Sequence, residues 1–171
     1  MTGQVTTGVH VWGGHGAQAL VAALSTVDSA VPAACLVPDL PGDRDLEALS
    51  DELLDTGIGD VLGDVLAEVQ RLLPGLTGSG RLLFLLPAEA ALGRPHATAA
   101  GAVAGGILSM ARTLAIELAR DDIAVNTVLY ADGAETAVAH QVAALLAIEA
   151  AAVTGQEIYV TAGSGLGRLR P

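Results

Sequence analysis

The stretch Ser109–Asn126, SMARTLAIELARDDIAVN, contains the end of a long helix, a turn and the start of a strand. The apolar pattern before the turn predicts a helix over 98–120, with Thr98 as its N-cap. The acidic pair Asp121-Asp122 marks the turn, and the residues Ile123–Leu129 that follow are expected to form a strand. A helix followed at once by a strand is the repeating unit of an α/β fold.

The same alternation extends outward from this stretch. The run Arg81–Leu86, RLLFLL, is continuously apolar, as a strand buried on both faces should be. Apolar residues in Ile58–Leu73 repeat with helical period, and Pro74-Gly75 is expected to end that helix. The other expected strands are Val9–Trp12, Ala33–Val37 and Glu157–Thr161. The other expected helices are Ala17–Leu24, Leu46–Leu54 with a break near Gly57, and Ala137–Glu149, and Ala88–His96 is expected to be a loop.

This order of elements predicts one α/β domain. We expect a reduced doubly wound (Rossmann-like) parallel sheet of about five strands, with helices on both faces. A length of 171 residues is typical of a single domain with a real core.

Composition excludes several classes of partner. The net charge is −11, and the chain has no lysine, so its eight basic residues are all arginines. Nucleic acids and anionic membranes require concentrated positive charge, and neither is expected as a partner. One cysteine, Cys35, excludes an internal disulfide framework, and its apolar surroundings predict burial. We see no signal peptide and no apolar stretch of the ~20 residues that a membrane span needs, which predicts a cytoplasmic protein.

From about Ala33 to Gly163 the chain resembles the short-chain dehydrogenase/reductase family. The stretch Gly80–Val128, and Ser109–Asn126 within it, is similar to the family's central strand, long helix and "Ile-x-Val-Asn" strand. Val153–Ile158 resembles the "Thr-Gly-Gln" segment before the family's last strand. A weaker third match, Leu46–Glu52, resembles the segment after its fourth strand. Three matches in the right order imply the family's fold.

The resemblance also implies that this chain has lost the family's redox residues. Reductases of the family use a Tyr-x-x-x-Lys pair and an upstream Ser, because a phenol of pKa ~10 needs a nearby cation to exchange protons near neutral pH. Counted from the matched motifs, the Tyr and Lys positions fall at Ala100 and Ala104, and the Ser position falls at about Pro87. We therefore expect no catalytic residues of the family's kind.

The cofactor region looks reduced as well. Residues 1–31 form only one βα unit before the family-like part, 32–171, where the family has three, so two strands are expected to be missing. The turn Gly13-Gly14-His15-Gly16 could cradle a phosphate at a helix N-terminus, with Gly13, Gly14 and Gly16 as weak candidates, or could simply be a tight turn. We expect no cofactor to be bound by this chain, and NAD(P) to bind in a partner subunit if at all.

Four side chains surround the place of the lost active site. Glu89 and His96 could form an acid–base pair, and Tyr130 and Asp132 follow a strand where the family's substrate lid looks deleted. The alternative interpretation is that these side chains belong to a solvated loop. No histidines or cysteines have the spacing of metal ligands, so no metal is expected.

Three functional hypotheses remain. The first is a catalytically inactive subunit that assembles with an intact short-chain reductase through the helices 58–73 and 98–120, or with itself, and stabilises or completes the active partner. The alternative is a homo-oligomeric enzyme with non-redox chemistry, a lyase, cyclase or isomerase, that uses the vacated pocket. A plain scaffold without a ligand is a third possibility.

Overall fold

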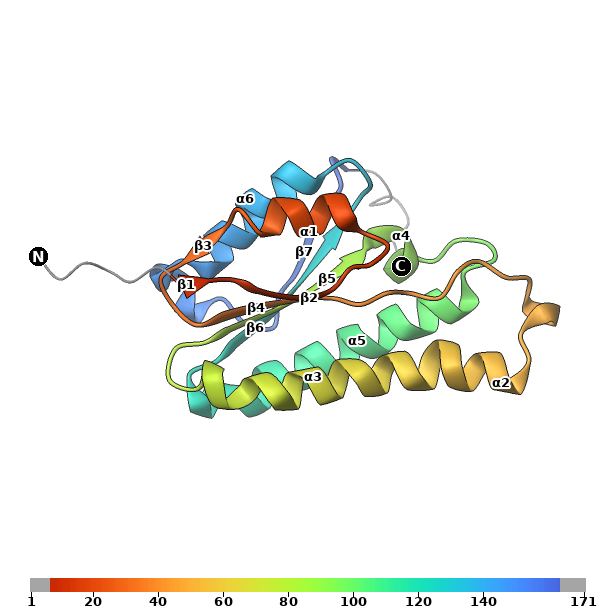
Figure 1. The fold of residues 1–171 in the computed structure, drawn as a ribbon, viewed down its shortest axis with the longest axis horizontal. Coiled ribbons are helices and arrows are strands. Elements are labelled where there is room, and N and C mark those ends of the chain that lie inside the picture. The colour runs from red at the N-terminus through yellow and green to blue at the C-terminus, as the bar shows by residue number, and fades with distance from the viewer. Residues whose placement is uncertain (1–6, 164–171) are drawn as a thin grey trace, which may run out of the picture.

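The computed structural model describes residues 7–163 (Figure 1). Its strands are β1 Thr7–Gly8, β2 His10–Gly13, β3 Asp28–Ser29, β4 Ala33–Val37, β5 Arg81–Pro87, β6 Ala124–Tyr130 and β7 Glu157–Val160. Its α-helices are α1 Gln18–Leu24, α2 Asp51–Leu54, α3 Val61–Leu76, α4 Ala88–Leu92, α5 Thr98–Glu117 and α6 Glu135–Leu146. Short helical turns cover Leu46–Ala48, Asp55–Asp60, Leu118–Asp121 and Ile148–Ala152.

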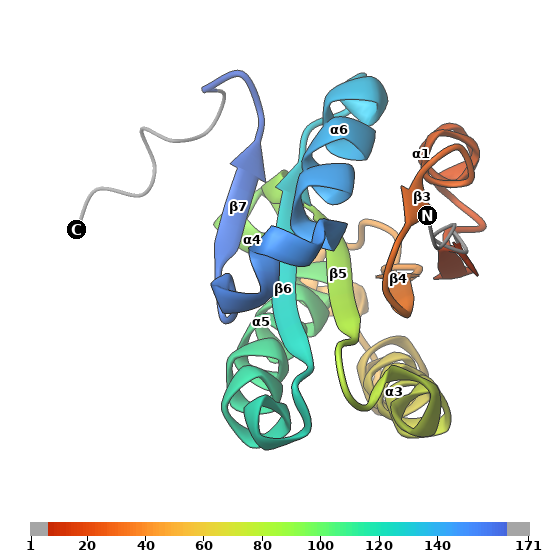
Figure 2. The same ribbon diagram turned by 90° about the vertical axis from the view of Figure 1, so that its left-hand side faces the viewer.

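Five strands form one parallel sheet in the order β2-β4-β5-β6-β7. The small strands β1 and β3 form a separate antiparallel pair. Helices α1 and α6 cover one face of the sheet, and α3 and α5 cover the other (Figure 2). The expected reduced Rossmann-like architecture, with five parallel strands and helices on both faces, is therefore confirmed.

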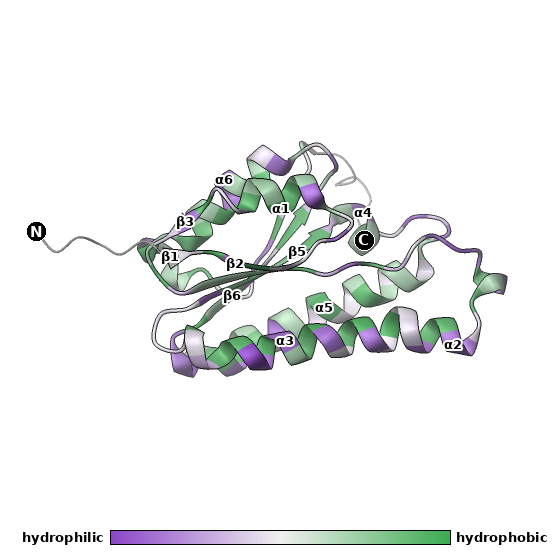
Figure 3. Ribbon diagram, in the orientation of Figure 1, coloured by the Kyte–Doolittle hydropathy of each residue, from purple (hydrophilic) through white to green (hydrophobic). Residues whose placement is uncertain are grey.

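Alternate residues of the buried strands supply two apolar layers. Leu82, Phe84 and Leu86 pack with α3 and α5, whereas Leu83 and Leu85 pack with α1 and α6. All five are fully buried, and the hydrophobic colour predominates along β5 in Figure 3. A strand buried on both faces needs such a continuous apolar run.

The connections between strands have an unusual feature. Each connection steps to the next strand in the same direction across the sheet, yet two of the helices lie on one face and two on the other. The connections through α1 and α6 must therefore have the opposite hand to those through α3 and α5. Because parallel crossovers are right-handed in about 98% of cases, one of these pairs belongs to the rare class.

The matched family motifs form one structural unit at the start of β7. The Asn126 side chain is buried, donates to the Val153 carbonyl at 2.7 Å and accepts from the Gln156 N–H at 3.0 Å. The Thr154 hydroxyl accepts from the Val125 N–H at 3.1 Å, and the Gly155 N–H donates to the Val125 carbonyl at 2.7 Å. Motifs that are 27 or more residues apart thus satisfy each other's backbone groups.

Several expected boundaries were wrong. Helix α3 continues through Pro74 to Leu76, and a bond of 3.2 Å from Thr77 N–H to Leu73 carbonyl closes its last turn. At its other end α3 joins α2 through a turn that crosses Gly57 without a break. The segment Leu46–Leu54 is divided because the Ser50 hydroxyl caps α2, accepting from Leu53 N–H at 3.3 Å.

Two further expectations need correction. The expected loop Ala88–His96 contains the helix α4, and Ala97 rather than Thr98 occupies the N-cap of α5. Thr98–Asp121 is also long and apolar enough to span a membrane by length and composition, contrary to our expectation. However, α5 packs its buried side on the sheet and on α3, as the core helix of a globular domain does. Cys35 is fully buried, as expected.

Candidate functional site

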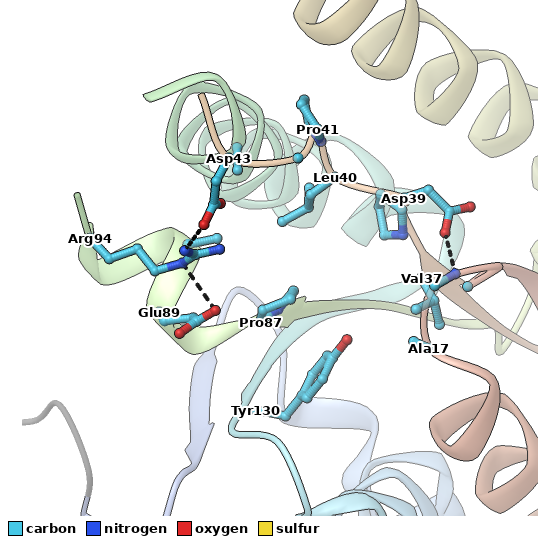
Figure 4. A pocket seen from close by; sticks show the side chains of 16 residues that line it. Ala17, Val37, Asp39, Leu40, Pro41, Asp43, Pro87, Glu89, Arg94 and Tyr130 are labelled. Carbon is cyan, nitrogen blue, oxygen red and sulfur yellow. Dashed lines mark hydrogen bonds and ion pairs between the residues drawn. The ribbon is translucent and has the colours of Figure 1, made fainter. Parts of the chain in front are cut away.

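A cavity of about 240 Å³ lies at the carboxyl ends of four neighbouring strands (Figure 4). The chain leaves β2 toward one face of the sheet and leaves β4 toward the other, and such a divergence opens a crevice between strand ends. The cavity is lined by Gly14, Gly16, Ala17, Val37–Asp43, Pro87, Glu89, Ala90, Arg94, Ala100 and Tyr130.

The glycine turn after β2 is built for close packing. Gly13 and Gly14 have φ of +78° and +75°, a region that disfavours side chains. A Cβ on Gly13 would lie 2.3 Å from the Val37 carbonyl oxygen, and one on Gly14 would lie 2.5 Å from Val21 Cγ2. These glycines therefore allow the turn to approach β4 and α1, whatever else they do.

Asp39 occupies the position at which this turn could hold an anion. Its carboxylate accepts from the Gly16 N–H at 3.0 Å and lies 2.6 Å from His15 Nδ1. Burial by itself raises the pKa of Asp39, but the hydrogen bonds from His15 and Gly16 outweigh it and lower the pKa below its usual value. The carboxylate is thus held in its charged form beside the helix N-terminus.

Arg94 links two acidic residues at the opposite side of the cavity. Its guanidinium donates to Asp43, and its Nε lies 3.1 Å from Glu89 Oε1 (Figure 4). The hydrogen bond to Asp43 raises the pKa of Arg94, so the guanidinium stays charged. Among the described residues that line the cavity, Arg94 is the single cation, against the carboxylates of Asp39, Asp43 and Glu89.

Tyr130 ends β6 opposite Pro87, and its side chain points into the cavity (Figure 4). Only 8% of the residue is exposed, and its hydroxyl forms no hydrogen bond with any residue in 7–163. Burial, together with the negative charges of Asp132, Glu135 and Asp39, raises the pKa of Tyr130 to about 12. The phenol is therefore a neutral donor and acceptor at physiological pH.

The positions counted for the family's redox residues are apolar in this structure. Pro87 and Ala100 both line the cavity, and Ala104, one turn further along α5, is fully buried beneath it. Two of the three counted positions, Pro87 and Ala100, therefore lie at one cavity.

The other two candidate residues lie outside the cavity lining. His96 Nδ1 lies 2.6 Å from Asp45 Oδ1, whereas Glu89 is paired with Arg94, so the two side chains considered as an acid–base pair have other partners. Asp132 is an exposed residue of the turn after β6, close enough to influence the Tyr130 hydroxyl. No three His, Cys, Asp or Glu side chains of the described chain gather as metal ligands would.

The sequence reasoning missed Asp39, Asp43 and Arg94. The acidic residues from Asp39 onward have the composition of a solvated face, yet Asp39 lies only two residues beyond the end of β4. The carboxyl ends of parallel strands meet at one edge of the sheet, so the position of Asp39 alone was a usable signal. The pairing of Asp43 with Arg94 joins residues 51 positions apart, and no local pattern predicts it.

The fold and its cavity define a Rossmann-like α/β protein with its site at the carboxyl end of a parallel sheet. No protein-family model and no curated protein matches the sequence. Solved structures do match the fold. A short chain dehydrogenase family protein from Francisella tularensis superposes with a TM-score of 0.66 and 17% identity, over 76% of this chain and 69% of that one.

Two reductases give similar values. The 3-ketoacyl-(acyl-carrier-protein) reductase from Brucella melitensis, complexed with NADH, has a TM-score of 0.67 and 20% identity over 77% of this chain and 66% of its own. A variant of the actinorhodin polyketide ketoreductase with NADPH has a TM-score of 0.63 and 24% identity over 78% and 68%. This chain thus has a short-chain dehydrogenase/reductase-like fold and spans about two thirds of the length of each of these proteins.

Proposed function

We propose that this chain is a pseudoenzyme, a catalytically inactive subunit that assembles with an intact short-chain reductase and stabilises or completes it. The reaction and its NAD(P) cofactor then belong to the partner. In this proposal, residues 1–31 are a first βα unit, and residues 32–171 are the part that resembles the family.

The observation that carries the proposal is the apolar lining at Pro87 and Ala100. Both residues line the cavity at the strand ends, where the resemblance expects a serine and a tyrosine. Neither side chain can transfer a proton, and the sequence has no lysine to occupy the family's Tyr-x-x-x-Lys position. Tyr130 does not replace it, because its raised pKa opposes ionisation at neutral pH.

A dinucleotide fits the described residues poorly. The Gly16 N–H at the start of α1 is already bonded to the Asp39 carboxylate, whose charge repels a pyrophosphate. The cavity of about 240 Å³ is also below the ~300 Å³ at which pockets for drug-sized ligands begin. We therefore derive no chemical step through a nicotinamide cofactor in this chain.

The surface proposed for assembly is the outer side of α3 and α5. A groove of about 590 Å³ runs between them, lined by the apolar residues Leu66, Val69, Leu73, Leu114 and Leu118 together with Gln70, Glu117 and Arg120. Leu66 is 42% exposed, and Ile116 on α5 is 80% exposed. Leu66 lines the groove, whereas Ile116 lies on α5 outside its lining, and exposed aliphatic side chains on neighbouring helices are typical of a surface that another chain covers.

Gly106 explains how the two helices form this surface. A Cβ at Gly106 would lie 3.1 Å from Leu62 Cδ2, so the glycine lets Leu62 of α3 rest on the backbone of α5. Each glycine in a helix costs about 1 kcal/mol relative to alanine, and close contact with Leu62 offsets part of that cost. Gly106 therefore allows α3 and α5 to pack closely at Leu62, and in this proposal the two helices form one docking surface.

The test is co-purification of the tagged full-length chain from its native host under mild conditions. We expect stoichiometric recovery of an intact short-chain reductase, identified by mass spectrometry. Leu66→Asp and Ile116→Asp should abolish that recovery, because each buries a charge in the proposed interface. Ile148→Asp, at a residue 48% exposed outside these helices, is the matched control and should leave recovery unchanged.

Recovery of a homo-oligomer without any reductase would contradict the hetero-oligomeric proposal. If the wild-type chain forms a homo-oligomer and Leu66→Asp does not, the self-association surface is formed by α3 and α5. The non-redox alternative then becomes the leading candidate, with the cavity at Tyr130 and Glu89 as its site.

A further inference from the structure

We propose that the cavity at the strand ends binds a small organic cation, a primary ammonium carried on a short apolar body. This inference goes beyond the proposed function and does not depend on assembly with a reductase. It rests on the unpartnered hydroxyl of Tyr130, on the charge of the cavity and on its size.

Tyr130 is the observation that points to a ligand. The residue is more than nine-tenths buried, its hydroxyl faces the cavity, and no residue in the described chain bonds that hydroxyl. The hydroxyl is open to the cavity, so a ligand placed there can bond to it directly. The oxygen can accept from an ammonium, and the ring face can stabilise the same charge.

The charges around this hydroxyl select a cation. Three carboxylates line the cavity against one guanidinium, and Arg94 is already shared between Asp43 and Glu89. Asp132 and Glu135 act on the same hydroxyl from just beyond the lining, and together with Asp39 they raise its pKa. An ammonium placed beside Tyr130 relieves this repulsion, whereas a carboxylate or phosphate adds to it.

The size and floor of the cavity limit the rest of the ligand. A volume of about 240 Å³ corresponds to about eight water molecules at ~30 Å³ each. Val37, Leu40, Pro87 and Ala100 supply an apolar lining on which a short alkyl chain can lie. Therefore the ligand class is a short alkylamine rather than a nucleotide or a polyamine of many atoms.

The experiment is a set of NMR titrations of the full-length protein with n-butylammonium, n-butanol and butyrate, three probes of one shape and different charge. We expect n-butylammonium to shift the amides of Gly14, Ala100 and Tyr130, and to bind at least tenfold more tightly than butyrate. Equal or tighter binding of butyrate would overturn the inference, as would shifts confined to other parts of the protein.

Variants locate the effect. Tyr130→Phe keeps the ring and removes the hydroxyl, and we expect it to weaken n-butylammonium about tenfold. Glu89→Gln should weaken it about threefold, because one carboxylate is lost from an exposed position. Glu149→Gln changes the net charge equally in a turn outside the cavity lining, and it should have no effect. Unchanged affinity in Tyr130→Phe would show that the hydroxyl is no part of a site.

Discussion

The two ends of the parallel sheet differ in how their polar groups are satisfied. Where β6 and β7 begin, Asn126, Thr154 and Gly155 bond to each other's segments. Where β2, β4 and β6 end, Asp39 and Arg94 form pairs that the family resemblance does not predict. The Tyr130 hydroxyl there has no hydrogen-bond partner in the described chain. The residues that resemble the family thus join the strands at one end, whereas the other end, where ligands bind in such folds, carries charged pairs.

This contrast separates a structural role from a chemical one. A sequence can keep the fold of a family through a few buried hydrogen-bond junctions, while the strand ends change freely. The role of each end can be tested by measuring stability, first at the Gly13 turn after β2 and then at the hydrogen bonds of Asn126.

The largest effect is expected from Gly13→Ala, in the turn after β2. The new Cβ would meet the Val37 carbonyl oxygen at 2.3 Å, and φ of +78° adds backbone strain. We expect a loss of about 3–4 kcal/mol in the free energy of unfolding, measured by urea denaturation. Gly133→Ala is the matched control, because its φ is +80° with no atom within 4 Å, and it should cost about 1 kcal/mol.

Equal losses in the two variants would show that backbone strain alone makes Gly13 necessary. The turn would then tolerate side chains, and its close approach to β4 would no longer explain its glycines. A larger loss in Gly13→Ala supports the packing role for the turn.

The second-largest effect is expected from Asn126→Ala, which removes the side chain that joins β6 to the start of β7. The substitution leaves the Val153 carbonyl and the Gln156 N–H without their partner at a residue that is 1% exposed. We expect the free energy of unfolding to fall by about 2 kcal/mol. Gln156→Ala removes an exposed side chain that bonds the Thr154 carbonyl, and it should cost less than about 0.5 kcal/mol. A loss as small for Asn126→Ala would contradict the junction's role.

Most of the architecture follows from the sequence, for a physical reason. Strands such as Arg81–Pro87 are buried on both faces and must be apolar throughout, so the pattern identifies them directly. Boundaries such as Pro74 were harder, because a backbone bond to Leu73 closes the turn beyond the proline and no side chain marks the end of the helix. The strand order and the unusual handedness of two connections have no local signal at all.

The candidate site was predicted less completely than the fold. Pro87 and Ala100, two of the positions counted from Asn126, line one cavity, and their assignment as the family's serine and tyrosine positions stays a prediction. The pairs of Asp39 with Gly16 and of Arg94 with Asp43 join segments far apart in the sequence. Only the folded sheet brings such segments together, so the charge of the cavity could not be derived from composition.

The smallest expected effect concerns Asp39 and depends on pH. Its pKa is lower in the folded protein than its unfolded value of ~3.9, so the carboxylate stabilises the fold above that value. This contribution disappears as the pH falls through the folded pKa. We expect Asp39→Asn to cost about 0.5 kcal/mol at pH 7, a small amount because the side chain is 42% exposed and screened by solvent.

The difference in unfolding free energy between wild type and Asp39→Asn should therefore be constant from pH 7 to about pH 5 and approach zero below pH 4. Added salt at 1 M should also reduce it at pH 7, since screening weakens an exposed charge. A difference that persists at low pH would mean that the shape of the side chain, rather than its charge, holds the Gly16 N–H. In that case the charge of Asp39 would not close the turn to anions, and a pyrophosphate could bind there.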